Sequence, residues 1–151
     1  MKRPLTVWLL AFWLLFLALG GLYGGIAMLL DTSGAALGMS EVLDELPVSN
    51  YILPGLFLLF GMGLAPLFLI YALLTLPQWP WLERLLPKKG LHWAWLGILV
   101  LCWVLFMWLI VEGFLIGFDW PIQYVTLVNG FLIMLFALLT SVRRYCAQRE
   151  T

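Results

Sequence analysis

Four long apolar stretches constrain this chain more than any other feature of its sequence. They lie at residues 5–30, 51–76, 91–118 and 121–140. Each reaches the roughly 20 residues that cross a hydrocarbon layer about 30 Å thick as an α-helix. Backbone groups in lipid must bond within their own segment, so a helix is expected in each stretch. The sequence therefore predicts an all-α integral membrane protein, with residues 1–151 forming a single four-helix transmembrane bundle.

The composition agrees with a membrane environment. Of the 151 residues, 64% are hydrophobic and 11% are charged, whereas soluble domains carry about 45–50% and about 25%. The first stretch exceeds the length of a signal-peptide core, so we expect it to be a retained helix. The basic residues form no continuous stripe, so nucleic acid is not an expected partner and the lipid bilayer is.

The sign of the charge changes from one end of each stretch to the other. All eight Lys and Arg lie near the amino terminus, in residues 77–90 or in the carboxyl-terminal tail. The connections at 31–50 and 119–120 contain acidic residues and no basic ones. Cytoplasmic segments of membrane proteins are enriched in Lys and Arg. We therefore expect both termini and the 77–90 loop in the cytoplasm, and the 31–50 loop outside.

The outer loop is the largest connection expected outside the membrane. Asp31 opens a turn, because its carboxylate can bond nearby backbone N–H groups. Ser40 is expected to cap a short helix that runs through Leu46 and ends at Pro47. The loop therefore predicts one turn and one short helix.

Several glycines are spaced as in contacts between membrane helices, where small residues allow close packing. They are Gly20, Gly21, Gly24, Gly25, Gly113 and Gly117. Two interpretations stay open: contact within the four-helix bundle, or a surface for a second copy or another membrane protein. In the second stretch, Pro66 should kink the helix and free the carbonyl of Met62.

Glu112 is the leading candidate for a functional residue. A carboxylate within a membrane helix is energetically costly, and such residues mark functional sites by default. In the alternative, Glu112 points into the bundle and bonds Asn129, or it reaches outward to water. The candidate polar site in the outer half consists of Glu112, Asn129, Asp31, Tyr23 and Tyr51, with Gln123, Tyr124 and Thr126 expected nearby.

Other residue types give no evidence of catalysis or cofactor binding. His92 is the only histidine and is expected on the interfacial surface. Cys102 and Cys146 imply no disulfide framework, and we expect them at different depths. The acidic residues of the outer loop lack the spacing of a dedicated calcium loop. No cofactor or metal site is expected, and no enzyme signature is present.

Short motifs in and around the outer loop resemble those of a known family. They are Gly24-Gly25, Asp31-Thr32-Ser33-Gly34, Leu37-Gly38-Met39 and Tyr51-Ile52-Leu53-Pro54-Gly55. They are similar to those of a family of small, uncharacterised bacterial four-helix membrane proteins. Family members commonly have Pro where this chain has Thr32, and an aromatic residue near the position of Val48. The resemblance implies a bacterial inner-membrane location and no particular activity.

Three functions follow as hypotheses. The first is an accessory or structural membrane protein that binds partner helices through its glycines. The second is a small transporter or channel component that uses Glu112, Asn129 and the Pro66 kink. The third is a membrane enzyme or a protein that binds lipid or quinone.

Overall fold

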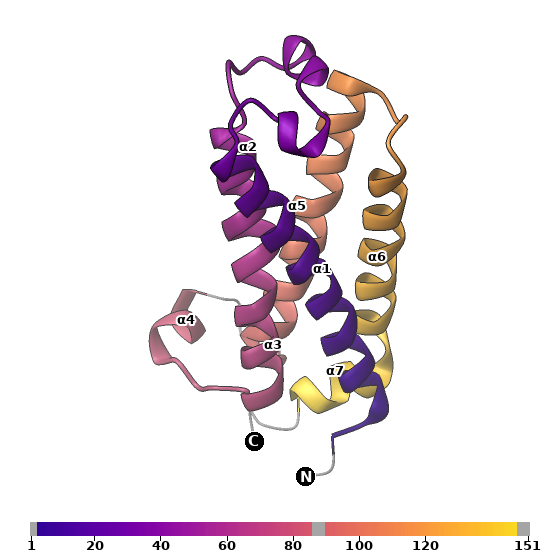
Figure 1. The fold of residues 1–151 in the computed structure, drawn as a ribbon. Helices are drawn as coiled ribbons and strands as arrows, with labels where there is room; N and C mark the ends of the chain where they lie inside the picture. The colour runs from indigo at the N-terminus through magenta and orange to yellow at the C-terminus, as the bar shows by residue number, and fades with distance from the viewer. Residues whose placement is uncertain (1–2, 86–89, 148–151) are drawn as a thin grey trace.

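The chain is all-helical over residues 3–85 and 90–147, which the computed structural model describes (Figure 1). No strand occurs in those ranges, which confirms the all-α class. The helical elements are α1 (Leu5–Leu30), η1 (Ala35–Leu37), η2 (Glu41–Glu45), α2 (Ile52–Leu56), η3 (Phe57–Leu64), α3 (Ala65–Thr75), α4 (Pro80–Leu85), α5 (Trp93–Ile116), α6 (Pro121–Leu138) and α7 (Thr140–Ala147).

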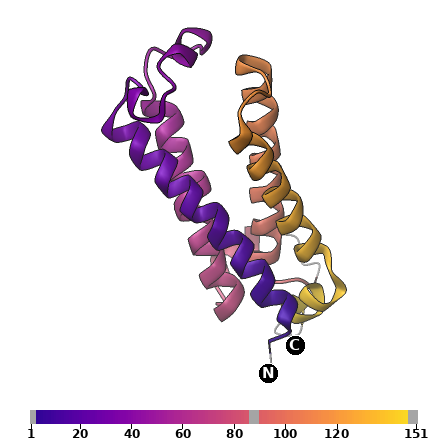
Figure 2. The ribbon, with the colours of Figure 1, turned by 45° about the vertical axis from the view of Figure 1, so that its right-hand side comes forward.

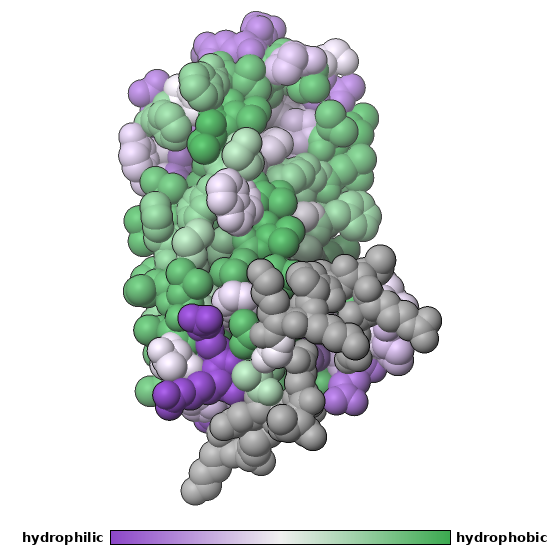
Figure 3. Space-filling model, turned by 180° about the vertical axis from the view of Figure 1, so that it is seen from behind, coloured by the Kyte–Doolittle hydropathy of each residue, from purple (hydrophilic) through white to green (hydrophobic). Residues whose placement is uncertain are grey.

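Four helical segments are long and apolar enough to cross a membrane: Leu5–Leu30, Ile52–Thr75, Trp93–Ile116 and Pro121–Leu138. The second combines α2, η3 and α3. Figure 3 shows a broad hydrophobic surface between hydrophilic residues at the upper and lower ends of the molecule. This distribution is the one expected for a chain whose middle contacts lipid and whose ends contact water.

The four segments form two pairs. The first segment packs along the second, and α5 packs along α6. Contacts of α1 with α6 and of α3 with α5 join the two pairs. Figure 2 shows the pairs close together at the end that holds the termini, and diverging toward the end that holds the outer loop.

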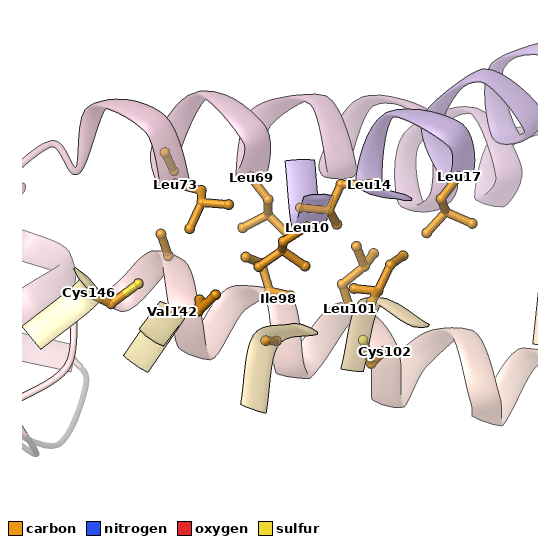
Figure 4. Close-up of a cluster of buried hydrophobic side chains, with 14 of the residues drawn as sticks. Leu10, Leu14, Leu17, Leu69, Leu73, Ile98, Leu101, Cys102, Val142 and Cys146 are labelled. Atoms are coloured by element: carbon orange, nitrogen blue, oxygen red, sulfur yellow. The ribbon is translucent and has the colours of Figure 1, made fainter. Parts of the chain in front are cut away.

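The hydrophobic core lies toward the end that holds the termini. Figure 4 shows side chains of α1, α3, α5 and α7 pointing toward one another there. The labelled residues are Leu10, Leu14, Leu17, Leu69, Leu73, Ile98, Leu101, Cys102, Val142 and Cys146. Burial of these side chains therefore holds the two pairs together at this end.

Three long-range hydrogen bonds join the segments at the same end. The Arg3 Nη2 group donates to the carbonyl of Leu74 at 3.0 Å. The hydroxyls of Thr6 and Ser141 are 2.8 Å apart. The Tyr145 hydroxyl donates to the carbonyl of Leu73 at 3.2 Å. The start of α1, the end of α3 and α7 are thus tied together.

The last apolar stretch ends earlier than the sequence predicted. α6 stops at Leu138, Leu139 adopts extended ψ of 138°, and α7 begins at Thr140. Within α7 the basic residues Arg143 and Arg144 are exposed, while Val142 is buried. Because α7 is amphipathic, its apolar side packs against the core. The helix therefore does not continue α6 as one straight span.

The second segment contains a π-helix, η3, immediately before Pro66. The N–H of Ala65 donates to the carbonyl of Phe60, five residues earlier. Proline has no N–H, so the ordinary ladder of bonds to the residue four positions back is interrupted at Pro66. The kink expected at Pro66 stays a prediction, and the structure has a π-helical segment, Phe57–Leu64, before this proline.

The short helix of the outer loop is a 3-10 helix, η2, and Ser40 does not cap it. Ser40 has helical angles (φ −62°, ψ −34°) and makes no capping side-chain bond. A second 3-10 turn, η1, precedes it and begins after Gly34, whose φ is +76°. The loop thus folds as two short 3-10 turns.

His92 lies inside the protein, not on its interfacial surface. It is 3% exposed, and its Nδ1 atom accepts the N–H of Ala94 at the start of α5. Its Nε2 atom is 3.0 Å from the carbonyl of Pro77, which also accepts the indole N–H of Trp93 at 2.9 Å. His92 therefore caps α5 and connects it to the segment after α3.

Candidate functional site

Glu112 is the only charged residue in the four membrane-length segments. It lies one turn before the end of α5 and is partly buried. The polar side chains of Gln123 and Trp108 lie beside its carboxylate. Trp108 is one turn earlier on α5, and Gln123 is in the first turn of α6. The carboxylate is therefore held between the two helices of one pair.

Gln123 organises the turn between α5 and α6. It is 3% exposed, its Oε1 atom accepts the N–H of Trp120 at 3.3 Å, and its Nε2 atom donates to the carbonyl of Gly117 at 3.1 Å. Gly117 has φ of +73° and ends α5, a conformation that favours glycine. The amide of Gln123 thus fixes the turn, beside the Glu112 carboxylate.

Asn129 lies deeper than the Glu112 pair. It is eight residues from the start of α6, or about 12 Å along the helix axis, whereas Gln123 is two residues from it. Asn129 is 2% exposed, and its Oδ1 atom has no hydrogen-bond partner among the described residues. The polar neighbours of Glu112 are Gln123 and Trp108, and the structure of the described residues shows no hydrogen bond between Glu112 and Asn129.

The two tyrosines of the candidate site differ in their burial. Tyr23 is 72% exposed on the outer part of α1. Tyr51 is 1% exposed, and its hydroxyl donates to the carbonyl of Met39 at 2.8 Å. Burial raises the pKa of Tyr51 above its usual value. Tyr51 therefore anchors the outer loop, while Tyr23 faces away from the protein.

Asp31 also belongs to the outer loop. Its Oδ1 atom accepts the hydroxyl and the N–H of Ser33 at 2.6 Å and 3.1 Å, and its Oδ2 atom accepts the N–H of Ala36 at 2.7 Å. The Ser33 hydroxyl, followed by these N–H groups, lowers the pKa of Asp31. Asp31 and Tyr51 are thus structural residues of the loop and do not meet Glu112.

The glycines divide between helix packing, a turn and open surface. Gly21 and Gly25 lie directly against the backbone of the second segment, at Met62 and Leu59. Gly24 contacts the side chain of Leu58, and no described residue lies near the Cβ position of Gly20. Gly113 and Gly117 face Phe118 and Asp119 of their own turn. Only part of the glycine set therefore mediates contact between helices.

One aromatic pair connects the two helix pairs near Glu112. Phe57 of η3 and Trp108 of α5 stack with ring centroids 4.2 Å apart and an interplanar angle of 21°. Trp108 also lies beside Glu112, one turn earlier on the same helix. The carboxylate is therefore linked through Trp108 to a residue of the opposite pair, a relationship that spacing in the sequence did not reveal.

An open pocket lies at the outer end, between η2 and the α5–α6 turn. Its volume is about 460 Å³, and its lining consists of Glu41, Val42, Glu45, Ile116, Asp119, Trp120 and Pro121. Ile116 is one helical turn beyond Glu112 on α5, so the two residues share a face of that helix. No group of metal-ligating residues within the described ranges is arranged to hold a metal ion.

Comparisons of the chain with family models, with curated proteins and with solved structures gave no significant match. The resemblance in the outer loop therefore stays a prediction based on its short motifs. The fold and the buried charge define the class: an all-helical protein with four helices able to cross a membrane, and one carboxylate within them.

Proposed function

We propose that this chain is a multi-pass protein of a bacterial inner membrane that binds a small, mainly apolar ligand in its outer half. In this proposal it serves as the binding unit of a small transporter. Both termini and the 77–90 loop lie in the cytoplasm. The separation of basic and acidic segments supports this orientation. The proximity of α7 to the start of α1 supports placing both termini on the same side of the membrane.

The position of Glu112 carries the proposal. Its carboxylate lies in a membrane-length helix, next to an aromatic pair that joins two otherwise diverging helix pairs. Burying a carboxylate at such a depth is unfavourable, and the chain contains no cation in its spans that would compensate it. A ligand bound beside Glu112 would contact the partly exposed rings of Trp108 and Phe57, and its affinity would offset that cost.

A second candidate is an accessory protein that binds a partner helix or a second copy. Gly21 and Gly25 are already in contact within the chain, so they are not free for a partner. The observation that favours this candidate is the open face of α1 at Gly20, next to the exposed Tyr23. The outer half of α1 is therefore the surface where a partner helix would bind.

Ligand-dependent thermal unfolding of the purified full chain tests the ligand-binding proposal. The probes are decylubiquinone, phosphatidylethanolamine and tetraphenylphosphonium, which represent neutral, zwitterionic and cationic apolar molecules. A ligand at 100 times its Kd stabilises the folded state by about 2.7 kcal/mol. We expect at least one probe to raise the unfolding temperature.

Two variants on the same helix locate the binding site. Trp108→Leu removes the ring that contacts Glu112 and Phe57, whereas Trp103→Leu changes a side chain that is 67% exposed. We expect the ligand-induced shift to disappear in Trp108→Leu and to persist in Trp103→Leu. The proposal is wrong if no probe shifts the transition, or if both variants retain the shift equally.

A further inference from the structure

We infer that the ligand of this site is a lipophilic organic cation. The inference rests on the proposed function and names the substrate class of the same site. Three observations support it: the carboxylate of Glu112 without a cation in the spans, the aromatic pair beside it, and an acidic pocket lined by Ile116, one helical turn beyond Glu112 on α5.

Glu112 selects for positive charge because nothing else in the spans neutralises it. Gln123 and Trp108 are the polar side chains beside the carboxylate, and both are neutral. No Lys, Arg or His occurs in the four membrane-length segments. Charges interact more strongly where water is scarce, so a cation near Glu112 gains more than it would at the surface. An anion in the same position is repelled.

The aromatic pair provides the second element of recognition. Indole and phenyl faces attract cations through their quadrupoles, and the attraction increases when the cation is desolvated. The stacked Phe57 and Trp108 rings lie beside Glu112 and also present apolar area. A soft organic cation satisfies both features, whereas a small metal ion retains its water and gains little from the rings.

The outer pocket provides an entry of the same polarity. Three carboxylates line it, those of Glu41, Glu45 and Asp119. Its apolar wall includes Ile116, one turn beyond Glu112 on the same face of α5. Clefts lined by one sign of charge raise the local concentration of oppositely charged molecules. The connections at 31–50 and 117–120 contain no Lys or Arg that would oppose this effect.

Three probes of similar shape and different charge test the inference. Binding of tetraphenylphosphonium, tetraphenylborate and neutral triphenylphosphine oxide is measured by titration calorimetry on the full chain in nonionic detergent. We expect the cation to bind at least about tenfold more tightly than the neutral probe, a difference of about 1.4 kcal/mol, and the anion not to bind. Equal binding of the neutral probe, or no binding of the cation, overturns the inference.

Two sets of variants assign the effect to these residues. Glu112→Gln keeps the size of the side chain and one acceptor oxygen and removes its charge, so we expect it to abolish the preference for the cation. The double variant Glu41→Gln, Glu45→Gln should weaken cation binding about threefold at an ionic strength of about 0.15 M, where screening confines charge effects to about 8 Å. The matched control Asp44→Asn changes a neighbouring carboxylate that does not line the pocket.

The outcomes separate the ligand class from the binding function. In one outcome, decylubiquinone or phosphatidylethanolamine raises the unfolding temperature and Trp108→Leu removes this shift, while tetraphenylphosphonium, tetraphenylborate and triphenylphosphine oxide bind equally. The cation inference then fails and the proposed function stands. If no apolar molecule binds, both fail. If Asp44→Asn weakens cation binding as much as the pocket variants do, the pocket is not the entry and the inference fails.

Discussion

Gly21 of α1 lies directly against the backbone carbonyl of Met62 in η3, with no space for a side chain between them. One turn later, Gly25 approaches Leu59 and the carbonyl of Gly55 in the same way. Membrane helices associate through close packing, because lipid tails are as apolar as their side chains. Glycine on α1 therefore brings the π-helical segment into contact with the first span.

Adding a methyl group at this contact should destabilise the protein. An alanine Cβ at Gly21 would overlap the Met62 backbone, which cannot move as freely as a side chain. We expect Gly21→Ala to lower the free energy of unfolding by about 1–3 kcal/mol. Titration with sodium dodecyl sulfate in mixed micelles measures the change.

Gly20→Ala is the matched control for this prediction. No described residue lies within 4 Å of the Cβ position at Gly20, and alanine favours helix over glycine by about 0.5–1 kcal/mol. The Gly20 variant should therefore be as stable as the parent or slightly more stable. Equal losses at both positions would show that Gly21 does not make the contact described.

Asn129 offers a test of a buried polar group without a partner. Its Oδ1 atom is buried and has no hydrogen bond among the described residues. An unpaired buried acceptor destabilises the folded state by about 1–3 kcal/mol. We expect Asn129→Leu to leave stability unchanged or to raise it in the same denaturant titration. A loss of more than about 1 kcal/mol would mean that Asn129 has a stabilising partner.

The outer loop should weaken in acid because of Asp31. Hydrogen bonds from the Ser33 hydroxyl and from N–H groups lower the pKa of Asp31 in the folded protein. The carboxylate therefore stabilises the loop at pH values above its unfolded pKa of about 3.9, and this contribution is lost as the pH falls through the lower folded value.

Nuclear magnetic resonance titration of the Asp31 carboxyl carbon checks this prediction. The midpoint should lie below the usual aspartate range. Ser33→Ala removes the hydroxyl that has the largest effect, so the midpoint should rise in that variant. A midpoint that does not respond to Ser33→Ala would contradict the assigned cause.

Cysteine labelling tests the orientation in the membrane. Cys102 and Cys146 are 1% and 0% exposed, and burial raises the pKa of Cys146 to about 12. Thiolates are the reactive form of cysteine, so the unmodified chain should remain unlabelled. Ala35→Cys in the outer loop should react with an impermeant maleimide in intact cells, and Arg144→Cys only after permeabilisation. The reverse pattern would invert the proposed topology.

The apolar stretches of the sequence predicted the helices well where the local sequence determines the ends of a helix. The expected helix at 5–30 matches α1, and the expected start at Pro121 matches α6. His92 was misplaced because an isolated histidine beside basic residues is typical of a surface, and the pattern does not reveal the Pro77 carbonyl that it meets. Its burial depends on how the segment after α3 folds back on α5.

The candidate site was predicted only in part. Glu112 stands out in the sequence because a carboxylate within an apolar stretch is visible there, and the structure places it in α5. Gln123 was expected in the same outer half, but the sequence did not indicate that it lies beside Glu112. The contact of Phe57 with Trp108 joins residues far apart in the chain, and no spacing rule connects them.

The sequence by itself determined the four apolar helices and the sorting of charge between their ends. Both are local properties, since a helix in lipid satisfies its own backbone and each connection carries its own charges. Only the tertiary structure decided which glycines contact another helix, which side chains lie beside Glu112, and where the two helix pairs diverge. Those features depend on the rotation and depth of each helix relative to its neighbours, which packing between distant segments sets.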